Sequence, residues 1–378
     1  MVTRRSYWNG AYTSQTGLVL IDVPQLDGYH ACRERALGKV TVHQLAKEAG
    51  VSLATVDRVL NQRTGVRPAT IERVEMAMER LDFRRDLAAA NLARRRTYPI
   101  CFILPDGPST FMRGLDAEVR SIAKHIRQSR VQVSVKVVPA FDGDVLADVI
   151  DEVDAQEFAG VVMVAADAPR VRSAINDLAD RGVHVVTLVS DVPTARRLHY
   201  SGIDNTAAGR TAGTLFGRFS RKPGKVAIVA GSMLLRDHVE RRMGFEQVIR
   251  SGFSDLEILP PIEGRDEAAL VEIALTKLLR DEPDIIGVYS LGGGNRGVIS
   301  ALESRGPDSQ DMVVIAHELT PATRRALMSG TIDALITQDA GHEVRSAIRV
   351  IQSKIDGHPL VPGEDQISID VFFRDNLP

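Results

Sequence analysis

A chain of 378 residues with a net charge of −2 is long enough to fold as two or three units. No segment approaches the roughly 18 consecutive apolar residues of a membrane-spanning helix, which excludes a helical membrane protein. The two cysteines, Cys32 and Cys101, have neither the spacing of a metal site nor the number needed for a disulfide framework. We therefore expect a cytoplasmic protein that makes no contact with a membrane and holds no metal or other cofactor.

Residues 1–38 precede every recognisable pattern in the chain. They contain Gly, Ser, Thr and Tyr without a sustained period, and the apolar run Gly17–Val23 is too short and too late for a signal peptide. We expect this segment to be a disordered leader or the product of a misassigned start codon. A basic arm that reaches into DNA is the alternative.

The stretch VTVHQLAKEAGVSLATVDRVLN, residues 40–61, is typical of two short helices joined by a tight turn. Gly50 supplies a left-handed residue at the turn, and Ser52 is placed to cap the second helix. The apolar residues Val42, Leu45 and Ala46 fall on one side of the first helix, and the second helix runs through Leu53, Val56, Val59 and Leu60. This is the helix-turn-helix pattern, whose second helix is free to enter the major groove of DNA.

The outer face of that second helix is small and polar, which permits close approach to base edges. Its residues are Ser52, Ala54, Thr55, Asp57 and Arg58. An ordinary helical hairpin is the alternative interpretation of these two helices. The segments that follow favour DNA binding instead.

A third helix and a short alanine-rich segment come next. Pro68 suits the first position of a helix, and the apolar residues at helical spacing after it are Ile71, Val74, Met78 and Leu81. Asp86 can cap the segment LAAANLARRR, residues 87–96. The order of VTVHQLAKEAGVSLATVDRVLN, then VEMAMERLDF, then the alanine-rich segment ending in Leu92 resembles the LacI/GalR family of bacterial transcription repressors, without insertion, over residues 39 to 97.

The resemblance implies a homodimer, or a tetramer, that reads a pseudo-palindromic operator in double-stranded DNA under the control of a small molecule. It implies these DNA contacts: Thr41, Ser52, Leu53, Ala54, Thr55, Asp57, Arg58, Asn61, Arg67, Ala89 and Leu92. Asp57 stands where the family usually has a serine, and it can accept a hydrogen bond from cytosine N4 or orient Arg58.

Residues 86–97 are expected to form a hinge that folds only on DNA. A helix of about ten residues is too short to be stable alone in water, but two copies can fold together at the centre of the operator. Leu92 would then enter between base pairs in the minor groove. A plain linker is the alternative.

The charge of the chain is unevenly distributed. The segment from Lys39 to Thr97 contains twelve Lys and Arg residues against seven Asp and Glu residues, a net charge of +5, so the remainder of the chain is acidic. A basic head suits phosphate binding, because neutralised phosphates release counterions. By itself this excess would equally suit a solvated basic face.

Beyond Pro99, apolar strands alternate with amphipathic helices. The strands are PICFILP, VQVSVKVVP, GVVMVA, HVVTLVSD, KVAIVAG, IIGVYSLG and DMVVIAHE. Continuous Val and Ile runs separated by helices indicate parallel strands buried on both faces. We therefore predict an all-α head with a hinge, followed by an α/β sensor domain of two doubly wound parallel lobes.

The family resemblance extends more loosely over this region, which is similar to the ribose-type periplasmic binding proteins, whose two lobes close on a sugar. It implies crossovers between the lobes near Ser201–Asn205, Ala316–Thr320 and Leu335–Asp339. The expected domains are the helix-turn-helix domain at 39–85, the hinge at 86–97, and the ligand-binding and dimerisation domain at 98–378. Lobe 1 comprises about 98–202 and 338–358, and lobe 2 comprises about 203–337 and 359–378.

Ligands of open α/β sheets bind beyond the carboxyl ends of the strands. The candidate ligand residues near these ends are Phe111, Asp191, Arg241, Asn295, Glu318 and Gln338. Their carboxylate, amide and guanidinium groups suit sugar hydroxyls, and Phe111 can stack on a sugar ring. The family places a ligand-binding arginine at the position of Arg241 and usually an aspartate where Glu318 stands. For each residue taken singly, a surface-loop or helix-cap role is the alternative.

Two other chemistries have less support. The run GGGNRG, residues 292–297, lacks both the GxGxxG order and the lysine of a phosphate-binding loop. His317 beside Glu318 resembles a catalytic pair, but a pocket-lining histidine is the simpler interpretation. No HExxH or GxSxG motif is present, so we expect no enzymatic activity.

We therefore expect a sequence-specific transcriptional regulator, most simply a repressor, whose operator affinity is controlled by a sugar, a polyol or a sugar acid bound between the lobes. The alternatives are a sugar-binding transport receptor and a sugar-converting enzyme with an appended DNA-binding head. The DNA-binding pattern and the lack of a recognisable export signal argue against the receptor, and turnover of the ligand would reveal the enzyme. The sequence does not identify the operator, the effector or the sign of the response.

Overall fold

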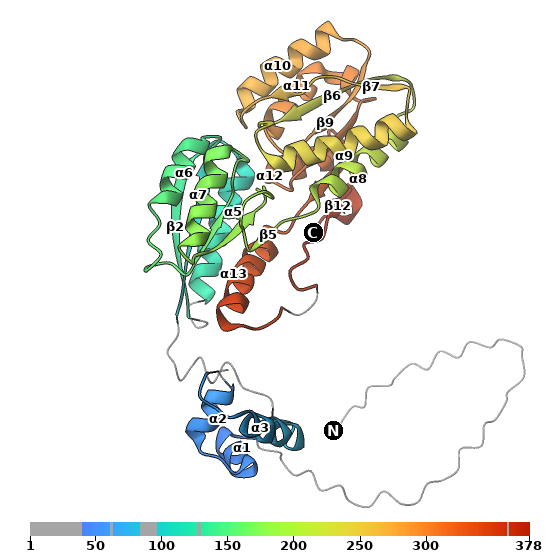
Figure 1. Cartoon of the computed structure of the whole chain (residues 1–378). Coiled ribbons are helices and arrows are strands. Elements are labelled where there is room, and N and C mark those ends of the chain that lie inside the picture. Colours follow the sequence, from blue (N-terminus) through green and yellow to red (C-terminus); the bar gives the residue numbers. More distant parts are fainter. Residues whose placement is uncertain (1–39, 61–62, 84–96, 127–129, 361–362) are drawn as a thin grey trace, which may run out of the picture. The chain divides into compact units, whose positions relative to one another are not determined.

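The computed structural model describes residues 40–60, 63–83, 97–126, 130–360 and 363–378. The chain divides into two compact units, residues 1–94 and 95–378. We call the described part of the first unit the head and that of the second unit the sensor, and each is described by itself (Figure 1). The predicted fold class, a helical head followed by a two-lobed α/β domain, is confirmed.

The head consists of three helices, α1 (Val42–Ala49), α2 (Leu53–Leu60) and α3 (Pro68–Arg80). Thr41 caps α1 through a capping box, and Gly50 ends this helix in the left-handed conformation, with φ 63°. The three helices enclose one small apolar core. Its buried side chains are Leu45, Ala46, Ala49, Val56, Val74, Ala77 and Phe83.

Two apolar residues of the head, Val42 and Leu53, lie at the surface. Val42 is 38% exposed and so does not share the core with Leu45 and Ala46, and Leu53, a predicted DNA contact, is 41% exposed. Each is the first residue of its helix. Helical side chains lean toward the N-terminus, so a side chain in the first position extends past the end of the packed face into solvent.

Lobe 1 of the sensor is a five-stranded parallel sheet in the order β2-β1-β3-β4-β5. Its strands are β1 (Tyr98–Asp106), β2 (Val131–Pro139), β3 (Gly160–Met163), β4 (His184–Leu188) and β5 (His199–Ser201). Its helices are α5 (Thr110–His125), α6 (Gly143–Asp151), α7 (Pro169–Asp180) and α13 (Ala340–Asp356).

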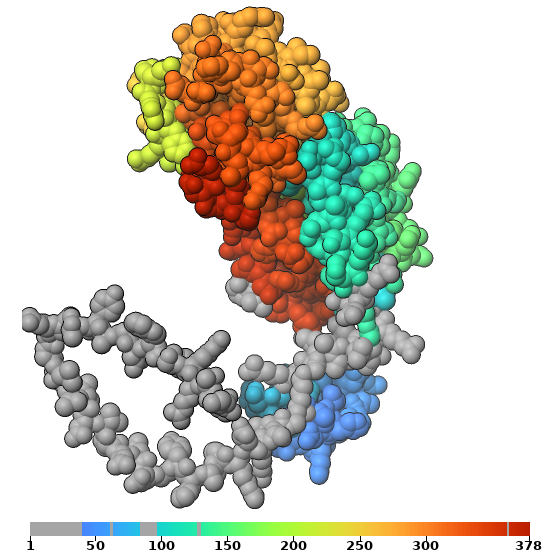
Figure 2. Space-filling view, turned by 180° about the vertical axis from the view of Figure 1, so that it is seen from behind, coloured from blue at the N-terminus to red at the C-terminus, as the bar shows by residue number. Residues whose placement is uncertain are grey.

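The helices of lobe 1 cover both faces of its sheet. Side chains of α6 and α7 form one apolar core, and those of α5 and α13 form the other. The central strands β1, β3 and β4 are therefore buried on both faces, as their continuous apolar runs predicted, whereas the edge strand β2 is partly exposed. Figure 2 shows the red segment of α13 beside the teal segment of α5, although the two are far apart in the sequence.

Lobe 2 is a seven-stranded sheet in the order β12-β11-β10-β9-β6-β7, with β8 also paired to β6. Its strands are β6 (Gly224–Ala230), β7 (Leu256–Ile258), β8 (Ile262–Glu263), β9 (Ile285–Ser290), β10 (Val313–His317), β11 (Ala334–Thr337) and β12 (Asp370–Phe372). Its helices are α8 (Asn205–Phe219), α9 (Arg236–Gly252), α10 (Ala268–Asp281), α11 (Asn295–Arg305) and α12 (Pro321–Ser329). The short edge strand β12 pairs antiparallel with β11 and was not predicted.

The chain passes between the lobes after β5, after β11, and again between α13 and β12. The first two passages lie within the predicted crossovers Ser201–Asn205 and Leu335–Asp339. The predicted crossover Ala316–Thr320 is wrong, because this segment joins β10 to α12, which packs in the core of lobe 2. A strand followed by a helix looks the same in sequence whether or not the helix changes lobe, so tertiary packing makes the difference.

Helices α8 and α9 run side by side in lobe 2 with close backbone contact (Figure 1). A Cβ atom at Gly209 would lie 2.0 Å from the backbone oxygen of Arg241, and a Cβ atom at Gly244 would lie 2.1 Å from that of Thr206. Only glycine permits such an approach. The contact brings Arg241 of α9 next to the first turn of α8, directly after the first crossover.

We expect Gly244→Ala to destabilise lobe 2, because the added methyl group collides with backbone atoms of α8. The free energy of unfolding should fall by about 1–3 kcal/mol in a urea titration. Gly114→Ala is the matched control, since a Cβ atom at this exposed position of α5 meets nothing within 4 Å. The control should be neutral or stabilising by about 0.5–1 kcal/mol. Equal effects from the two substitutions would contradict the close-packing argument.

Candidate functional site

The described members of the predicted DNA-contacting set lie at the surface of the head. All are exposed except Thr55, which is half-buried: Thr41, Ser52, Leu53, Ala54, Asp57, Arg58 and Arg67. Five of these seven lie on α2 or at its start. The outer face of α2 is therefore exposed, as a helix that enters the major groove of DNA requires.

Two of these residues also stabilise helix ends. Thr41 Oγ1 accepts a hydrogen bond from the backbone N–H of Gln44 at 3.3 Å, and Ser52 Oγ accepts one from the N–H of Thr55 at 3.2 Å. A hydroxyl at a helix N-terminus lies beside backbone N–H groups that favour an anionic ligand. Both positions therefore suit contact with DNA phosphates better than contact with base edges.

Asp57 on α2 forms an ion pair that the sequence did not predict. Its Oδ2 lies 3.4 Å from Nη1 of Arg63, and both side chains are more than half exposed. Such an exposed pair contributes at most about 1 kcal/mol to stability. The proposed roles of Asp57 in orienting Arg58 or in accepting from a cytosine stay predictions.

The remaining predicted DNA contacts, Asn61, Ala89 and Leu92, lie outside the described residues. The same holds for the leader, residues 1–38, and for nearly all of the hinge, residues 86–97. The wedge and folding-on-DNA hypotheses for the hinge stay predictions.

Two hollows lie between the lobes of the sensor, beyond the carboxyl ends of the strands. The smaller has a volume of about 110 Å³ and is lined by Phe111 of lobe 1 and by Asp266, Asn295 and Glu318 of lobe 2. The larger has a volume of about 860 Å³ and is lined by Phe111, Glu318 and Gln338. Four of the six predicted ligand residues thus face the cleft, from both lobes.

Arg241, the fifth predicted ligand residue, is 1% exposed and lies at the centre of a buried polar network. Its Nε donates to Asn205 Oδ1 at 2.8 Å, and its Nη1 donates to the backbone oxygen of Leu291 at 2.7 Å. The same Nη1 lies 3.6 Å from Glu318 Oε1 and 3.9 Å from Asp237 Oδ2. Two carboxyl groups and two further acceptors thus offset the cost of burying this guanidinium.

The network around Arg241 joins the two crossovers. Asn205 Nδ2 donates to Tyr200 Oη at 2.9 Å, and Tyr200 Oη donates to the backbone oxygen of Val189, also at 2.9 Å. At the other crossover, Gln338 Nε2 donates to Glu318 Oε1 at 2.9 Å. A continuous series of polar contacts therefore runs from β5 of lobe 1, through lobe 2, to the segment that returns to lobe 1. The sequence analysis did not identify Tyr200 or Asn205 as members of the site.

Glu318 directly follows β10 and has a left-handed backbone conformation, with φ 75°, which is rare for a glutamate and typical of constrained functional positions. Burial raises the pKa of its carboxyl to about 7, while Arg241 and the hydrogen bond from Gln338 act in the opposite direction. This carboxyl can therefore donate or accept a hydrogen bond near neutral pH.

Three further carboxyl groups belong to the site and were missed in the sequence. They are Asp237 on α9 and Glu343 on α13, which are buried, and Asp266 before α10, which is partly buried. Burial raises the pKa of Glu343 well above its ordinary value, and Glu318 raises it further. Two of them left a signal in the sequence. Asp237 lies one helical turn before Arg241, and Glu343 has the helical spacing of the buried face of α13.

The glycine run before α11 allows the backbone to approach these side chains. A Cβ atom at Gly292 would lie 2.9 Å from Arg241 Nη1, and one at Gly293 would lie 2.2 Å from Asp266 Oδ1. Close packing against the site accounts for these glycines without a bound phosphate.

Asn295 and His317 are fixed by hydrogen bonds at the ends of β9 and β10. Asn295 Oδ1 accepts from Ser290 Oγ at 2.6 Å, and its Nδ2 donates to the backbone oxygen of His317 at 2.8 Å. His317 Nε2 lies 2.8 Å from Tyr289 Oη, and burial lowers the pKa of the imidazole well below its ordinary value. A neutral, buried histidine suits a wall of the site rather than a catalytic base.

Asp191, the sixth predicted ligand residue, is not among the residues that line the two hollows. Its Oδ1 accepts from Thr187 Oγ1 at 2.6 Å and from the N–H of Val192 at 2.7 Å. Arg197 donates to both carboxylate oxygens of Asp191. Most of its acceptor capacity is thus used within lobe 1, and its contact with a ligand stays a prediction.

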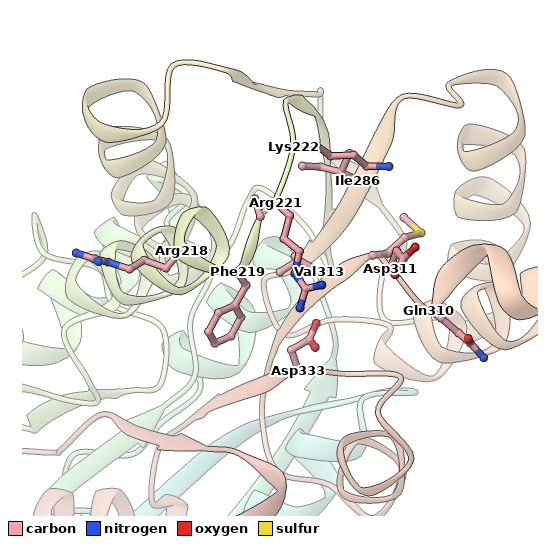
Figure 3. A pocket seen from close by; sticks show the side chains of 11 residues that line it. Arg218, Phe219, Arg221, Lys222, Ile286, Gln310, Asp311, Val313 and Asp333 are labelled. Carbon is pink, nitrogen blue, oxygen red and sulfur yellow. The ribbon is translucent and has the colours of Figure 1, made fainter.

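A third hollow, of about 660 Å³, lies at the opposite end of the lobe 2 sheet, where β9 and β10 begin at Ile285 and Val313. None of the predicted ligand residues lines it. Figure 3 shows that its polar side chains do not converge, since Arg218 and Gln310 extend in opposite directions. The interlobe cleft is therefore the better candidate for a ligand site.

The described residues contain neither a membrane-spanning helix nor a group of side chains suited to a metal ion. Within the described ranges, no helix combines the length and the apolar character needed to cross a bilayer. In the same part of the chain, no three His, Cys, Asp or Glu side chains are grouped in a way that could hold a metal ion.

Two family models match the chain. Residues 41–86 match the model described as bacterial regulatory proteins, lacI family, and residues 100–359 match the model described as periplasmic binding protein domain. The first match covers the helix-turn-helix region, and the second covers nearly all of the sensor.

Curated relatives match over part of their length. Catabolite control protein A of Streptococcus mutans is 26% identical over 196 residues, which are 52% of this chain and 56% of that protein. The maltose regulon regulatory protein MalI of Vibrio furnissii is 40% identical over 91 residues, 24% of this chain and 64% of that protein. The matched regions thus span 56% and 64% of the two relatives, less than two thirds of either.

Solved structures resemble the sensor at low sequence identity. GanP, a glucose-galactose binding protein from Geobacillus stearothermophilus, is 22% identical with a TM-score of 0.66, covering 75% of this chain and 99% of that one. A putative LacI transcriptional regulator from Bacteroides fragilis is 15% identical with a TM-score of 0.65, covering 74% and 98%. These similarities support the two-lobed fold.

The raised pKa of Glu318 predicts how the stability of the sensor depends on pH. The folded state keeps this proton up to a pKa of about 7, whereas the unfolded state loses it near the ordinary pKa of 4.5. The folded state therefore binds more protons between these values, and the free energy of unfolding should fall as pH rises through this window. The titration of Glu318 should lower the free energy of unfolding by about 3 kcal/mol across this window.

Chemical denaturation across this pH window measures the effect. Glu318→Gln should remove the contribution, so that the variant gains stability relative to the original protein as pH rises. Glu303→Gln, at an exposed position of α11, should leave the pH profile unchanged. Parallel profiles for the original protein and Glu318→Gln would show that the carboxyl titrates normally in the folded state.

Proposed function

We propose that this chain, a member of the LacI family of bacterial regulatory proteins, is a sequence-specific DNA-binding regulator of transcription. In this proposal the head binds an operator, and a small polyhydroxylated effector bound between the lobes of the sensor controls operator affinity. The simplest form is a repressor that acts in the cytoplasm. Its role is binding rather than catalysis.

The observation that carries this proposal is the buried network around Arg241. It includes Asn205 beside the first crossover and Gln338 within the second. A molecule that changes these hydrogen bonds acts directly on the segments about which two lobes open and close. Such a site is suited to convert ligand binding into a change of lobe arrangement.

The head supplies the DNA-binding half of the proposal. A helix-turn-helix head reads one half-site, so a pseudo-palindromic operator requires a homodimer or a tetramer. Leu53 and Ala54 at the start of α2 suit base edges, and Arg58 one turn later suits guanine O6 and N7. The net charge of +5 between Lys39 and Thr97 favours the phosphate backbone.

Effector and operator are coupled through the equilibrium between lobe arrangements. An effector shifts this equilibrium only by the difference of its affinities for the two arrangements. By reciprocity, operator DNA changes effector affinity by the same factor. Either sign of coupling, release or strengthening of DNA binding, is compatible with the proposal.

The other function classes have less support. A transport receptor has no use for a helix-turn-helix head. The enzyme alternative rested on His317 beside Glu318, but His317 is buried and its Nε2 is engaged by Tyr289, so this histidine is poorly placed to act as a base on a bound sugar.

We expect Arg58→Ala to weaken binding to the specific operator by about 1–3 kcal/mol and to relax specificity at one base pair per half-site. Selection of binding sites from random DNA by the original protein and by the variant measures both effects. Arg280→Ala, at an exposed position of α10 in the sensor, is the control and should leave the selected sequence unchanged. An identical selected sequence for Arg58→Ala would remove this residue from base recognition.

We expect Gln338→Ala to abolish the response to the effector and to leave effector-free operator affinity within about threefold, or about 0.65 kcal/mol. The reason is that Gln338 lines the cleft of the sensor and donates a hydrogen bond to Glu318 there. Operator titrations by fluorescence anisotropy, with and without an effector identified by thermal shift, measure the response. Gln247→Ala, exposed on α9, should keep it. A full response from Gln338→Ala would move the effector site elsewhere.

A further inference from the structure

The buried polar atoms of the cleft are mostly hydrogen-bond acceptors. In the described part of the sensor, the buried acceptor oxygens around the site that have no hydrogen-bond partner are Asp237 Oδ1, Asp266 Oδ1, Gln338 Oε1, Glu343 Oε1 and Glu343 Oε2. The one guanidinium nitrogen of the site in the same condition is Nη2 of Arg241. A ligand that satisfies these atoms must bring more donors than acceptors.

The cleft also has more acidic than basic side chains. Three carboxyl groups, of Asp237, Glu318 and Glu343, lie around the guanidinium of Arg241, and a fourth, of Asp266, lies near Asp237 and His238. Burial is the largest cause of the raised pKa of Glu343, and Glu318 and Asp237 raise it further. These carboxyls therefore interact with one another, and a second positive charge among them would offset their repulsion.

Two side chains indicate that this group of acids is a ligand site and not only a buried charge cluster. Arg241 is 1% exposed and keeps Nη2 unpaired among the described residues, although its other nitrogens have partners. Gln338 is 8% exposed, donates to Glu318 through Nε2, and lines the larger hollow. A buried polar atom left unpaired destabilises the protein, and a ligand that supplies the missing partner removes this cost.

We propose that the effector carries a protonated amine as well as hydroxyl groups, as an amino sugar or an amino polyol does. This inference rests on the proposed function, because it names the ligand class of the same cleft. The ammonium group has three donors and no acceptor, and it binds among the carboxyls of Asp237, Glu318 and Glu343. Hydroxyl groups bind Arg241 Nη2, and the ring of Phe111 covers the carbon skeleton from lobe 1.

Other charged ligands fit the cleft less well. A metal ion would need a set of protein ligands, and the described residues contain no group of three or more His, Cys, Asp or Glu arranged to hold one. A sugar acid would add a fifth carboxyl group to a site with one guanidinium. A neutral sugar can donate its hydroxyl groups to the carboxyl oxygens, but it brings no positive charge to offset the repulsion among them.

Matched sets of sugars distinguish these ligands. Each set shares one ring and differs in one group: glucose, glucosamine and glucuronic acid, or galactose, galactosamine and galacturonic acid, or mannose, mannosamine and mannuronic acid. Isothermal titration calorimetry with the full-length protein near neutral pH measures each affinity. We expect an amine of one set to bind at least tenfold more tightly than its neutral parent, and the acid to bind most weakly. Tighter binding of a neutral sugar or an acid, or no binding by any amine, would overturn the proposal.

A charge-removing variant tests the role of the carboxyl groups. Glu343→Gln keeps the size of the side chain but cannot become a carboxylate when an ammonium group binds beside it, so it should weaken the amine at least tenfold and the neutral parent less than threefold. Glu303→Gln, exposed on α11, is the matched control and should change neither affinity. Thermal unfolding verifies that each variant is folded, and Glu318→Gln gives the same comparison if Glu343→Gln is not. Equal losses for amine and parent contradict a role for charge.

Operator binding by the same protein separates this inference from the proposed function. If a neutral sugar or a sugar acid controls operator affinity, the regulator stands and the amine proposal fails. If an amino sugar binds the cleft tightly but leaves operator affinity unchanged, the ligand class stands and the proposed control of DNA binding fails.

Discussion

The buried guanidinium of Arg241 is the group on which the geometry of the sensor depends. It holds the first turn of α8 through Asn205, the loop after β9 through Leu291, and the loop after β10 through Glu318. These partners come from three separate segments. Without Arg241, each of them would lose a buried hydrogen-bonding or ionic partner. The glycine contacts between α8 and α9 are part of the same arrangement, because they bring the backbone of Arg241 close enough for its side chain to reach all three. The cleft thus has one rigid wall in lobe 2, against which lobe 1 can move.

This arrangement is costly because the buried site holds more carboxyl groups than positive charges in a medium of low dielectric constant. Stability by itself would favour apolar side chains or fully paired ions at these positions. The site instead keeps Glu318 in a left-handed backbone conformation and Glu343 on the buried face of a helix. Departures of this kind from the rules for a stable core are expected where a protein binds a ligand. Stability and recognition therefore compete within the same few side chains.

The sequence predicted those residues of the site that directly follow a strand. Glu318 and Gln338 follow strands whose carboxyl ends meet at one edge of a sheet, so a position after a strand was enough to place them together. Asp191 follows β4 in the same way, but Arg197 binds its carboxylate within lobe 1, and no local pattern reveals such a partner. Glu343 reaches the site from the side of a helix, so only tertiary packing shows its place. The false crossover near Ala316–Thr320 has the same origin, since local sequence does not say on which lobe the next helix packs.

Neither lobe is continuous in the sequence, and this affects how the chain can fold while it is being synthesised. The burial of one face of the lobe 1 sheet is completed only when α13 packs beside α5, and the edge of β11 in lobe 2 is covered only when β12 is present. Both elements follow strands β1 to β11 in the sequence, so both lobes remain incomplete until these two segments have been made. The core of the head, by contrast, is complete at Phe83, before the first strand of the sensor begins. A nascent chain can therefore present a folded head while its sensor still exposes an open sheet edge and an uncovered apolar face, the surfaces most prone to aggregation during folding.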